Sequence, residues 1–152
     1  MNKPSTLPWT VLVDKANRQV KQARVNLNAA QARHDALQAN LDRVNTLIAE
    51  YQTREEEADA SGRSMRDRIN ARAFIAQLNS VAARLAQETA QATQAVEQSR
   101  RHLLGQEHEV LKMQKLAENA QRAERQVQNR REQKGYDDLA LLRQNWLRDS
   151  PA

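Results

Sequence analysis

Hydrophobic residues recur at steps of three and four residues along the first third of the chain. Such spacing, kept for about six heptads, is typical of a coiled coil. The two sets of apolar positions are Val13, Val20, Leu27, His34, Leu41 and Ile48, and Ala16, Ala23, Ala30, Leu37, Val44 and Tyr51. The pattern predicts one long helix over about residues 9–57, which Pro4 and Pro8 precede or begin, because proline suits the first turn of a helix.

The pattern stops at "TREEEADASGR", which contains Gly62, and resumes on a second helix expected over about residues 68–134. Its apolar positions begin with Phe74, Leu78, Val81 and Leu85. They continue, after one extra step of four that would locally unwind a supercoil, with Ala92, Val96, Ser99, Leu103, Gln106, Val110, Met113, Ala117 and Ala120. Polar Ser99 and Gln106 are expected to weaken this seam.

A chain reversal at residues 58–67 would bring the two helices side by side, and it predicts which of their residues face each other. If they run antiparallel, Tyr51 faces Phe74, Leu47 faces Leu78 and Val44 faces Val81, so large residues meet large residues beside the turn. The alanine-rich middle is expected to be thin. The sequence therefore predicts an all-α fold, a long antiparallel two-helix coiled-coil hairpin that forms a single domain over residues 1–152.

The two helices have unequal lengths, so the end of the second should overhang the first. Residues after about 118 are expected to lack a partner within the chain, and Gly135 is expected to kink or end the helix. A last amphipathic segment, 136–148, carries Leu139, Leu142 and Trp146 on one face. An apolar helix face without a partner in its own chain indicates one in another chain.

Composition agrees with long helices rather than a compact core. Hydrophobic residues make up 39% of the 152 residues, aromatic residues only 3% and charged residues 28%. The chain has no cysteine, no apolar run of membrane-spanning length, and an N-terminus, "MNKPSTLPWTVLV", unlike a signal peptide. We therefore expect a soluble cytoplasmic protein. Its net charge of +5 favours an acidic partner without identifying one.

Candidate chemistry is sparse, and we predict no catalytic residues, no metal site and no cofactor. His34, His102 and His108 are scattered; the first two fall on expected seam positions, where they serve as polar spacers. The "TREEE" carboxylates point around a helix and are expected to be solvated. Basic residues enrich the second helix, but acidic residues interrupt them and no aromatic lies among them for base stacking, so we expect no nucleic acid as partner.

The apolar residues beside the turn exceed what two helices can bury. A two-stranded seam needs two positions per heptad, whereas three or four are apolar here. Two interpretations remain open. The surplus either reinforces the core locally, or it leaves an exposed docking edge formed by Leu47, Tyr51, Phe74 and Leu78.

At these residues the sequence resembles the FliJ family, a general export component of the bacterial flagellar type III secretion system. The resemblance covers nearly the whole chain. It rests on "LIAEYQ" before the turn, "FIAQLNSVAARL" after it and "REQKGYDDLA" near the end, together with the spacing from Tyr51 to Phe74.

The resemblance implies a non-enzymatic antiparallel coiled coil similar to the central stalk of rotary ATPases. It implies a place in the pore of the hexameric export ATPase FliI, contact with the membrane-embedded export gate FlhA, and escort of export chaperones. Such a protein is cytoplasmic and peripheral at the inner face of the cell membrane. By the same resemblance, the ATPase-facing residues are Arg122, Arg125, Arg130 and Arg131, and the gate-docking residues are Tyr51, Phe74 and Leu78 with Leu47, Val44, Val81 and Leu85.

The sequence alone is therefore compatible with two classes of function. One is the stalk and adaptor of flagellar export. The other is a coiled-coil scaffold, either the stalk of a virulence type III secretion system or an unrelated basic protein that binds nucleic acid or a membrane surface.

Overall fold

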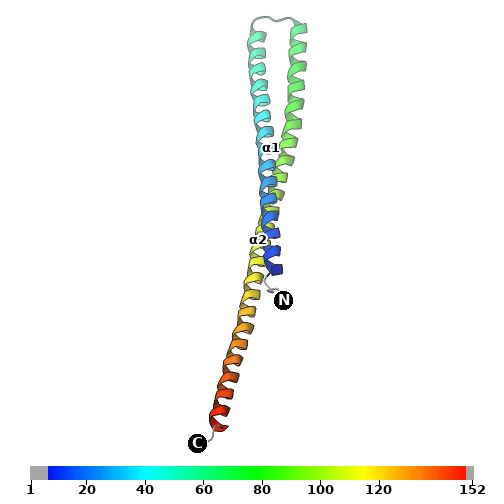
Figure 1. Ribbon diagram of the computed structural model, residues 1–152. Coiled ribbons are helices and arrows are strands. Elements are labelled where there is room, and N and C mark those ends of the chain that lie inside the picture. The colour runs from blue at the N-terminus through cyan, green and yellow to red at the C-terminus, as the bar shows by residue number, and fades with distance from the viewer. Residues whose placement is uncertain (1–6, 150–152) are drawn as a thin grey trace. The chain divides into compact units, whose positions relative to one another are not determined.

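The computed structural model describes residues 7–149 as two helices joined by a short turn. Helix α1 spans Leu7–Ala60 and helix α2 spans Met65–Asp149. Figure 1 shows the two helices joined at the turn. The described residues contain no strand and 97% of them are helical, so the predicted all-α hairpin is confirmed.

The predicted seam of α1 is confirmed at every position. All twelve residues of the two heptad sets are buried or half-buried, and Ala16, Val20, Ala23 and Ile48 are fully buried. The same steps of three and four continue beyond Tyr51 to half-buried Glu55 and Ala58. The seam therefore extends closer to the turn than the apolar pattern indicated.

The predicted register shift in α2 is wrong. One row of buried and half-buried residues runs along it in unbroken steps of three and four: Ala71, Ile75, Leu78, Ala82, Leu85, Thr89, Ala92, Val96, Ser99 and onward to Glu124; a few neighbours of this row, such as Val81, are half-buried as well. The apparent extra step arose because Phe74 and Val81 were taken as seam residues in place of Ile75 and Ala82. A large side chain that flanks a seam imitates a seam residue in the sequence.

The turn is shorter than the predicted tip of residues 58–67, because helix continues to Ala60 and begins again at Met65. Gly62 has a φ of 80°, a conformation that glycine adopts without a steric cost and that ends α1. The Ser64 hydroxyl accepts a hydrogen bond from the backbone N–H of Asp67 at 3.3 Å. Ser64 is therefore the N-cap of α2.

The expected break at Gly135 does not occur, since α2 continues through it to Asp149. A single glycine within a helix costs only about 1 kcal/mol relative to alanine, which strong helix formers on both sides offset. The predicted segments 68–134 and 136–148 are thus parts of one helix.

The contacts divide the chain into two units. In the first, residues 7–20 of α1 lie with the part of α2 from residue 106 onward; Ala16 and Val20 are buried there, and Val110 and Met113 are half-buried. Every residue from 125 to 149 is exposed. The predicted overhang therefore begins later than residue 118, since Ala120 and Glu124 are still half-buried, and no described residue of α1 covers residues 125–149.

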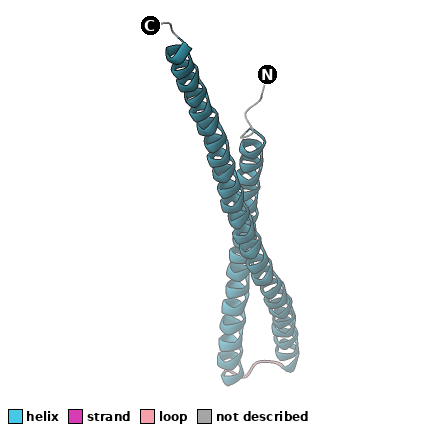
Figure 2. Cartoon of the chain, turned by 90° about the horizontal axis from the view of Figure 1, so that it is seen from below, coloured by secondary structure: helices cyan, strands magenta, loops and turns pink. Residues whose placement is uncertain are grey.

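The second unit, residues 21–105, contains the turn and the longer stretch of paired helix. Ala23, Thr89, Ala92 and Val96 are its most deeply buried residues apart from Ile48. Towards the turn, Figures 1 and 2 show the two helices drawing apart. Small side chains allow close approach of helices, so the alanine-rich middle that we expected to be thin is the best-buried part of this unit.

Candidate functional site

An aromatic pair joins the two helices near the turn. The rings of Tyr51 and Phe74 pack edge to face with their centroids 4.9 Å apart. The Arg54 guanidinium lies 5.4 Å from the centre of the Tyr51 ring, at cation–π distance. The predicted pairing of Tyr51 with Phe74 is confirmed, whereas Arg54 was missed although it stands three residues from Tyr51 on the same helical face.

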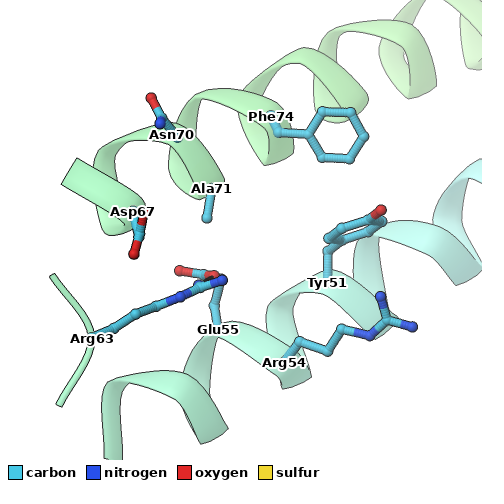
Figure 3. Close-up of a pocket in the computed structure, with 8 residues that line it drawn as sticks. All are labelled: Tyr51, Arg54, Glu55, Arg63, Asp67, Asn70, Ala71 and Phe74. Atoms are coloured by element: carbon cyan, nitrogen blue, oxygen red, sulfur yellow. Dashed lines mark hydrogen bonds and ion pairs between the residues drawn. The ribbon is translucent and has the colours of Figure 1, made fainter. Parts of the chain in front are cut away.

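A groove of about 440 Å³ opens beside this aromatic pair. Figure 3 shows side chains from both helices and the turn converging on it. Its walls combine two aromatic rings with cations, carboxylates and an amide, and the lining residues are Tyr51, Arg54, Glu55, Arg63, Asp67, Asn70, Ala71 and Phe74. The groove is thus aromatic at one end and charged at the end near the turn, so it combines apolar and polar surface as protein-binding sites do.

Two ion pairs hold the turn end of this groove. The Arg63 guanidinium contacts the Glu55 carboxylate, and Arg68 Nε lies 3.1 Å from an oxygen of Asp59. The Glu55 side chain is only 15% exposed. The expectation that the "TREEE" carboxylates are all solvated is therefore wrong for Glu55, because this residue occupies a seam position and contacts Arg63 of the turn.

Heptad positions place Leu47, Phe74 and Val81 on one edge of the helix pair, whereas the exposed residues Met65 and Ile69 at the start of α2 lie outside this row. Leu47 directly precedes seam residue Ile48, as Phe74 precedes Ile75 and Val81 precedes Ala82. In an antiparallel pair, the rows that precede the first seam position of each heptad run along the same edge. The opposite edge carries Asn45, Gln52, Arg72 and Asn79, and its one large apolar residue near the turn is exposed Met65.

Burial separates the seven predicted docking residues into two groups. Leu47 and Phe74 are each 42% exposed, and Leu47 also lines a shallow hollow with Asp42, Arg43 and Thr46. The other five are half-buried, namely Val44, Tyr51, Leu78, Val81 and Leu85. Both sequence interpretations therefore hold in part, since the seam buries some of the surplus and one edge stays open.

The four predicted ATPase-facing arginines are all exposed on the terminal part of α2. Successive residues of an α-helix are turned by about 100°, so Arg122, Arg125, Arg130 and Arg131 lie on several sides of the helix rather than on one. From residue 122 to residue 134 five basic residues stand against two acidic residues. This stretch is a positively charged rod surface.

The histidines form no common site. His34 is half-buried at its seam position and its Nδ1 lies 3.1 Å from an Asp35 carboxylate oxygen. Hydrogen bonds from His34 and Gln31 lower the pKa of Asp35. His102 is exposed, so its predicted seam position is wrong; Leu103 takes that place.

Across residues 7–149, no group of three or more histidine, cysteine or acidic side chains is arranged to hold a metal ion. Neither described helix has a stretch long and apolar enough to cross a bilayer.

Comparison with known proteins identifies the family to which the chain belongs. No curated protein and no solved structure matches the chain. The family model described as "Flagellar FliJ protein" matches residues 6–147, nearly the whole chain, and this family is a non-enzymatic component of flagellar export. Together with the helical hairpin, this match establishes that the chain belongs to the FliJ family of flagellar export-associated coiled-coil proteins.

Proposed function

We propose that this protein is the stalk of the flagellar export apparatus, which couples the hexameric export ATPase FliI to the export gate FlhA at the cytoplasmic face of the membrane. Escort of export chaperones is part of the same proposed role. The observation that carries the proposal is the open apolar edge beside the turn, formed by Leu47, Phe74 and the half-buried Tyr51.

The edge has the features of a docking surface for a protein. Aromatic residues with a neighbouring arginine are frequent in the energetic centre of protein interfaces. The Tyr51–Phe74 pair and the Arg54 contact supply that combination, and the ion pairs of Arg63 and Arg68 fix the turn beside it. The opposite edge has exposed Met65 but no aromatic pair with a neighbouring arginine, so we assign gate binding to the edge of Leu47 and Phe74.

The terminal part of α2 fits insertion into a ring. A helix whose arginines face several sides meets a surrounding wall better than a flat partner, which would contact one side only. Residues 125–149 are exposed along their whole length, which leaves room for such a wall on every side. We therefore assign ATPase contact to Arg122, Arg125, Arg130 and Arg131.

Gate binding is tested with the double variant Leu47→Ala/Phe74→Ala. Titration calorimetry against the cytoplasmic domain of FlhA should show binding weakened by at least tenfold, about 1.4 kcal/mol or more. The matched control is Asn45→Ala/Asn79→Ala on the opposite edge, which should bind as the unsubstituted protein does. Melting curves of both variants should stay close to that of the unsubstituted protein. Equal loss of binding in the two variants would reject the assigned edge.

ATPase binding is tested separately with Arg122→Gln/Arg125→Gln and with Arg130→Gln/Arg131→Gln. Each pair should weaken association with FliI, and the loss should shrink at high salt, because exposed charges are screened. Neither pair should alter gate binding. If only one of the two pairs mattered, the partner would contact one side of the helix, and a surrounding ring would be the wrong model.

A further inference from the structure

The terminal part of α2 carries an apolar stripe that no described residue of the chain covers. Gly135, Leu139, Leu142 and Trp146 follow one another at steps of four, three and four, and thus lie on one face of the helix. The three large side chains are among the most exposed apolar residues in the protein, with Trp146 at 71%.

This stripe is not a continuation of the seam with α1. The steps of the α2 seam, extended beyond Glu124, lead to Val127, Arg131, Lys134, Asp138, Leu141 and Asn145, most of which are polar. The stripe lies one residue later, which turns its face by about 100° on a regular helix. It is therefore a separate surface with its own direction.

A hollow suited to a large side chain lies within the stripe. It has a volume of about 320 Å³ and is lined by Glu132, Gly135, Tyr136 and Leu139. Four residues at this spacing form the hole that receives one side chain of a facing helix in coiled-coil packing. Gly135 leaves the hole open, since nothing lies within 4 Å of where its Cβ would be.

We propose that this stripe binds the same stripe of a second copy of the chain, with the two helices antiparallel. Trp146 of each copy then enters the hole around Gly135 of the other, and Leu139 packs against Leu142 of the other. A second copy is the expected partner because the stripe is complementary to itself. The stripe supplies both the largest side chain and, eleven residues earlier, the hole that lacks a Cβ. Only an antiparallel arrangement brings them together at both ends.

The flanking residues agree with this register. Residue 149 of one copy lies level with residue 132 of the other, so the overlap stays within the exposed span of residues 125–149. On one flank this register brings Tyr136 of one copy beside Arg143 of the other, a pair of residues that can form a cation–π contact. On the other flank Asp138 meets Asn145, which can donate a hydrogen bond to it.

Charge also favours the overlap at this place. From residue 132 to residue 149 four acidic residues stand against three basic ones, so two copies do not repel strongly. The preceding stretch with its four arginines remains outside the overlap. A helix pair of this length buries on the order of 1,000 Å², the lower end for specific interfaces, so the dimer should be reversible. It would cover residues near the proposed ATPase surface and would thus compete with ring entry.

Sedimentation equilibrium of the full chain tests the proposal, with a matched pair of leucine variants. The unsubstituted protein should dimerise at a concentration of tens of micromolar, on the order of −6 to −7 kcal/mol. Leu142→Ala should weaken the dimer at least tenfold. Leu141→Ala, at an exposed leucine one residue away and off the stripe, should leave it unchanged. A protein that stays monomeric, or equal losses in the two variants, would overturn the proposal.

Two further variants test the hole and the orientation. Gly135→Leu should raise helix content, because glycine is a poor helix former, and yet should weaken the dimer by filling the hole. Since the chain has no cysteine, Leu139→Cys and Leu142→Cys report orientation by disulfide formation. A mixture of the two should cross-link between unlike copies more than either variant does alone. Preferential 139–139 and 142–142 disulfides would show parallel helices and reject the proposed geometry.

If the stripe instead belongs to the ATPase interface, Leu142→Ala should weaken binding to FliI while the unsubstituted protein remains monomeric. This result would overturn the dimer and leave the proposed stalk function intact. A dimer that dissociates when FliI is added, with Leu142→Ala binding FliI at full strength, would support the dimer as a form that precedes assembly.

Discussion

Within the unit of residues 21–105, two stretches of the helix pair differ in how deeply their seam residues are buried. The close-packed stretch, Thr89, Ala92 and Val96 on α2, is built from small side chains and is buried to within 7% exposure at each residue. The open stretch, Leu47, Ile48, Tyr51 and Phe74, has far larger side chains, yet only Ile48 is buried. Larger side chains therefore do not give a more deeply buried two-helix seam.

The difference follows from the distance between the helices. Small seam residues let two backbones approach, so each side chain is covered by the other helix. Large residues hold the helices apart, and with no third element the sides of the pair remain open to solvent. The open stretch gives up burial, and in exchange it presents apolar surface on a defined edge. The most hydrophobic part of this unit is thus the part available to a partner.

The sharpest test of this contrast compares two adjacent residues of the open stretch. Ile48→Ala should lower the free energy of unfolding by about 2–5 kcal/mol, because it empties a buried seam position. Leu47→Ala should cost less than about 1 kcal/mol, since that side chain is 42% exposed. Urea denaturation of the two variants measures both values. Equal destabilisation would mean that the edge of Leu47 belongs to the core.

The close-packed stretch should instead resist enlargement. Ala92→Leu should destabilise by about 1–3 kcal/mol, because an added side chain would force the helices apart. Ala95→Leu, at an exposed position of the same helix, should be nearly neutral. Thermal melting of the pair decides the matter. A stabilised Ala92→Leu variant would show that the alanine-rich middle has spare room.

The sequence predicted the architecture well because heptad spacing depends only on local steps. Twelve seam positions of α1 and the Tyr51–Phe74 pairing followed from it, although the seam positions Glu55 and Ala58 did not. The errors share one cause, which is that spacing reports the presence of apolar residues but not which of two neighbours faces the partner. Phe74 looked like a seam residue because it is large, and Thr89 did not because it is polar.

The candidate site could be predicted less completely. The surplus of apolar residues indicated a docking edge, but the degree of exposure depends on how far the helices diverge. The ion pairs across the turn depend on which rotamers Arg63 and Arg68 adopt, and no sequence pattern contains that information. The break expected at Gly135 failed for a related reason. Glycine permits an interruption, but flanking helix formers decide whether one occurs.

A smaller effect is expected at Thr89, the polar member of the close-packed stretch. Its hydroxyl donates a hydrogen bond to the Leu85 carbonyl at 2.7 Å. That carbonyl belongs to a helix and has a backbone donor of its own, so the bond only provides a partner for the threonine hydroxyl. Thr89→Val should therefore stabilise the unit by about 0.5–1 kcal/mol through added apolar burial. Thr93 makes the same kind of bond to the Thr89 carbonyl but is exposed, so Thr93→Val should change stability little. Destabilisation by Thr89→Val would indicate that the hydroxyl has a further role in the seam.

The smallest expected effect concerns the charges that close the open stretch at the turn. Arg68 Nε lies 3.1 Å from an Asp59 carboxylate oxygen. Both side chains are more than one-third exposed, so water and salt screen the pair. Arg68→Gln should cost no more than about 1 kcal/mol, and the cost should vanish in high salt. Arg72→Gln, an exposed arginine one turn further along α2, provides the control and should have no measurable effect. A loss well above this value that persists in high salt would show that Arg68 acts through packing of its alkyl chain. The divergence of the helices near the turn would then depend on that packing rather than on the size of the aromatic residues.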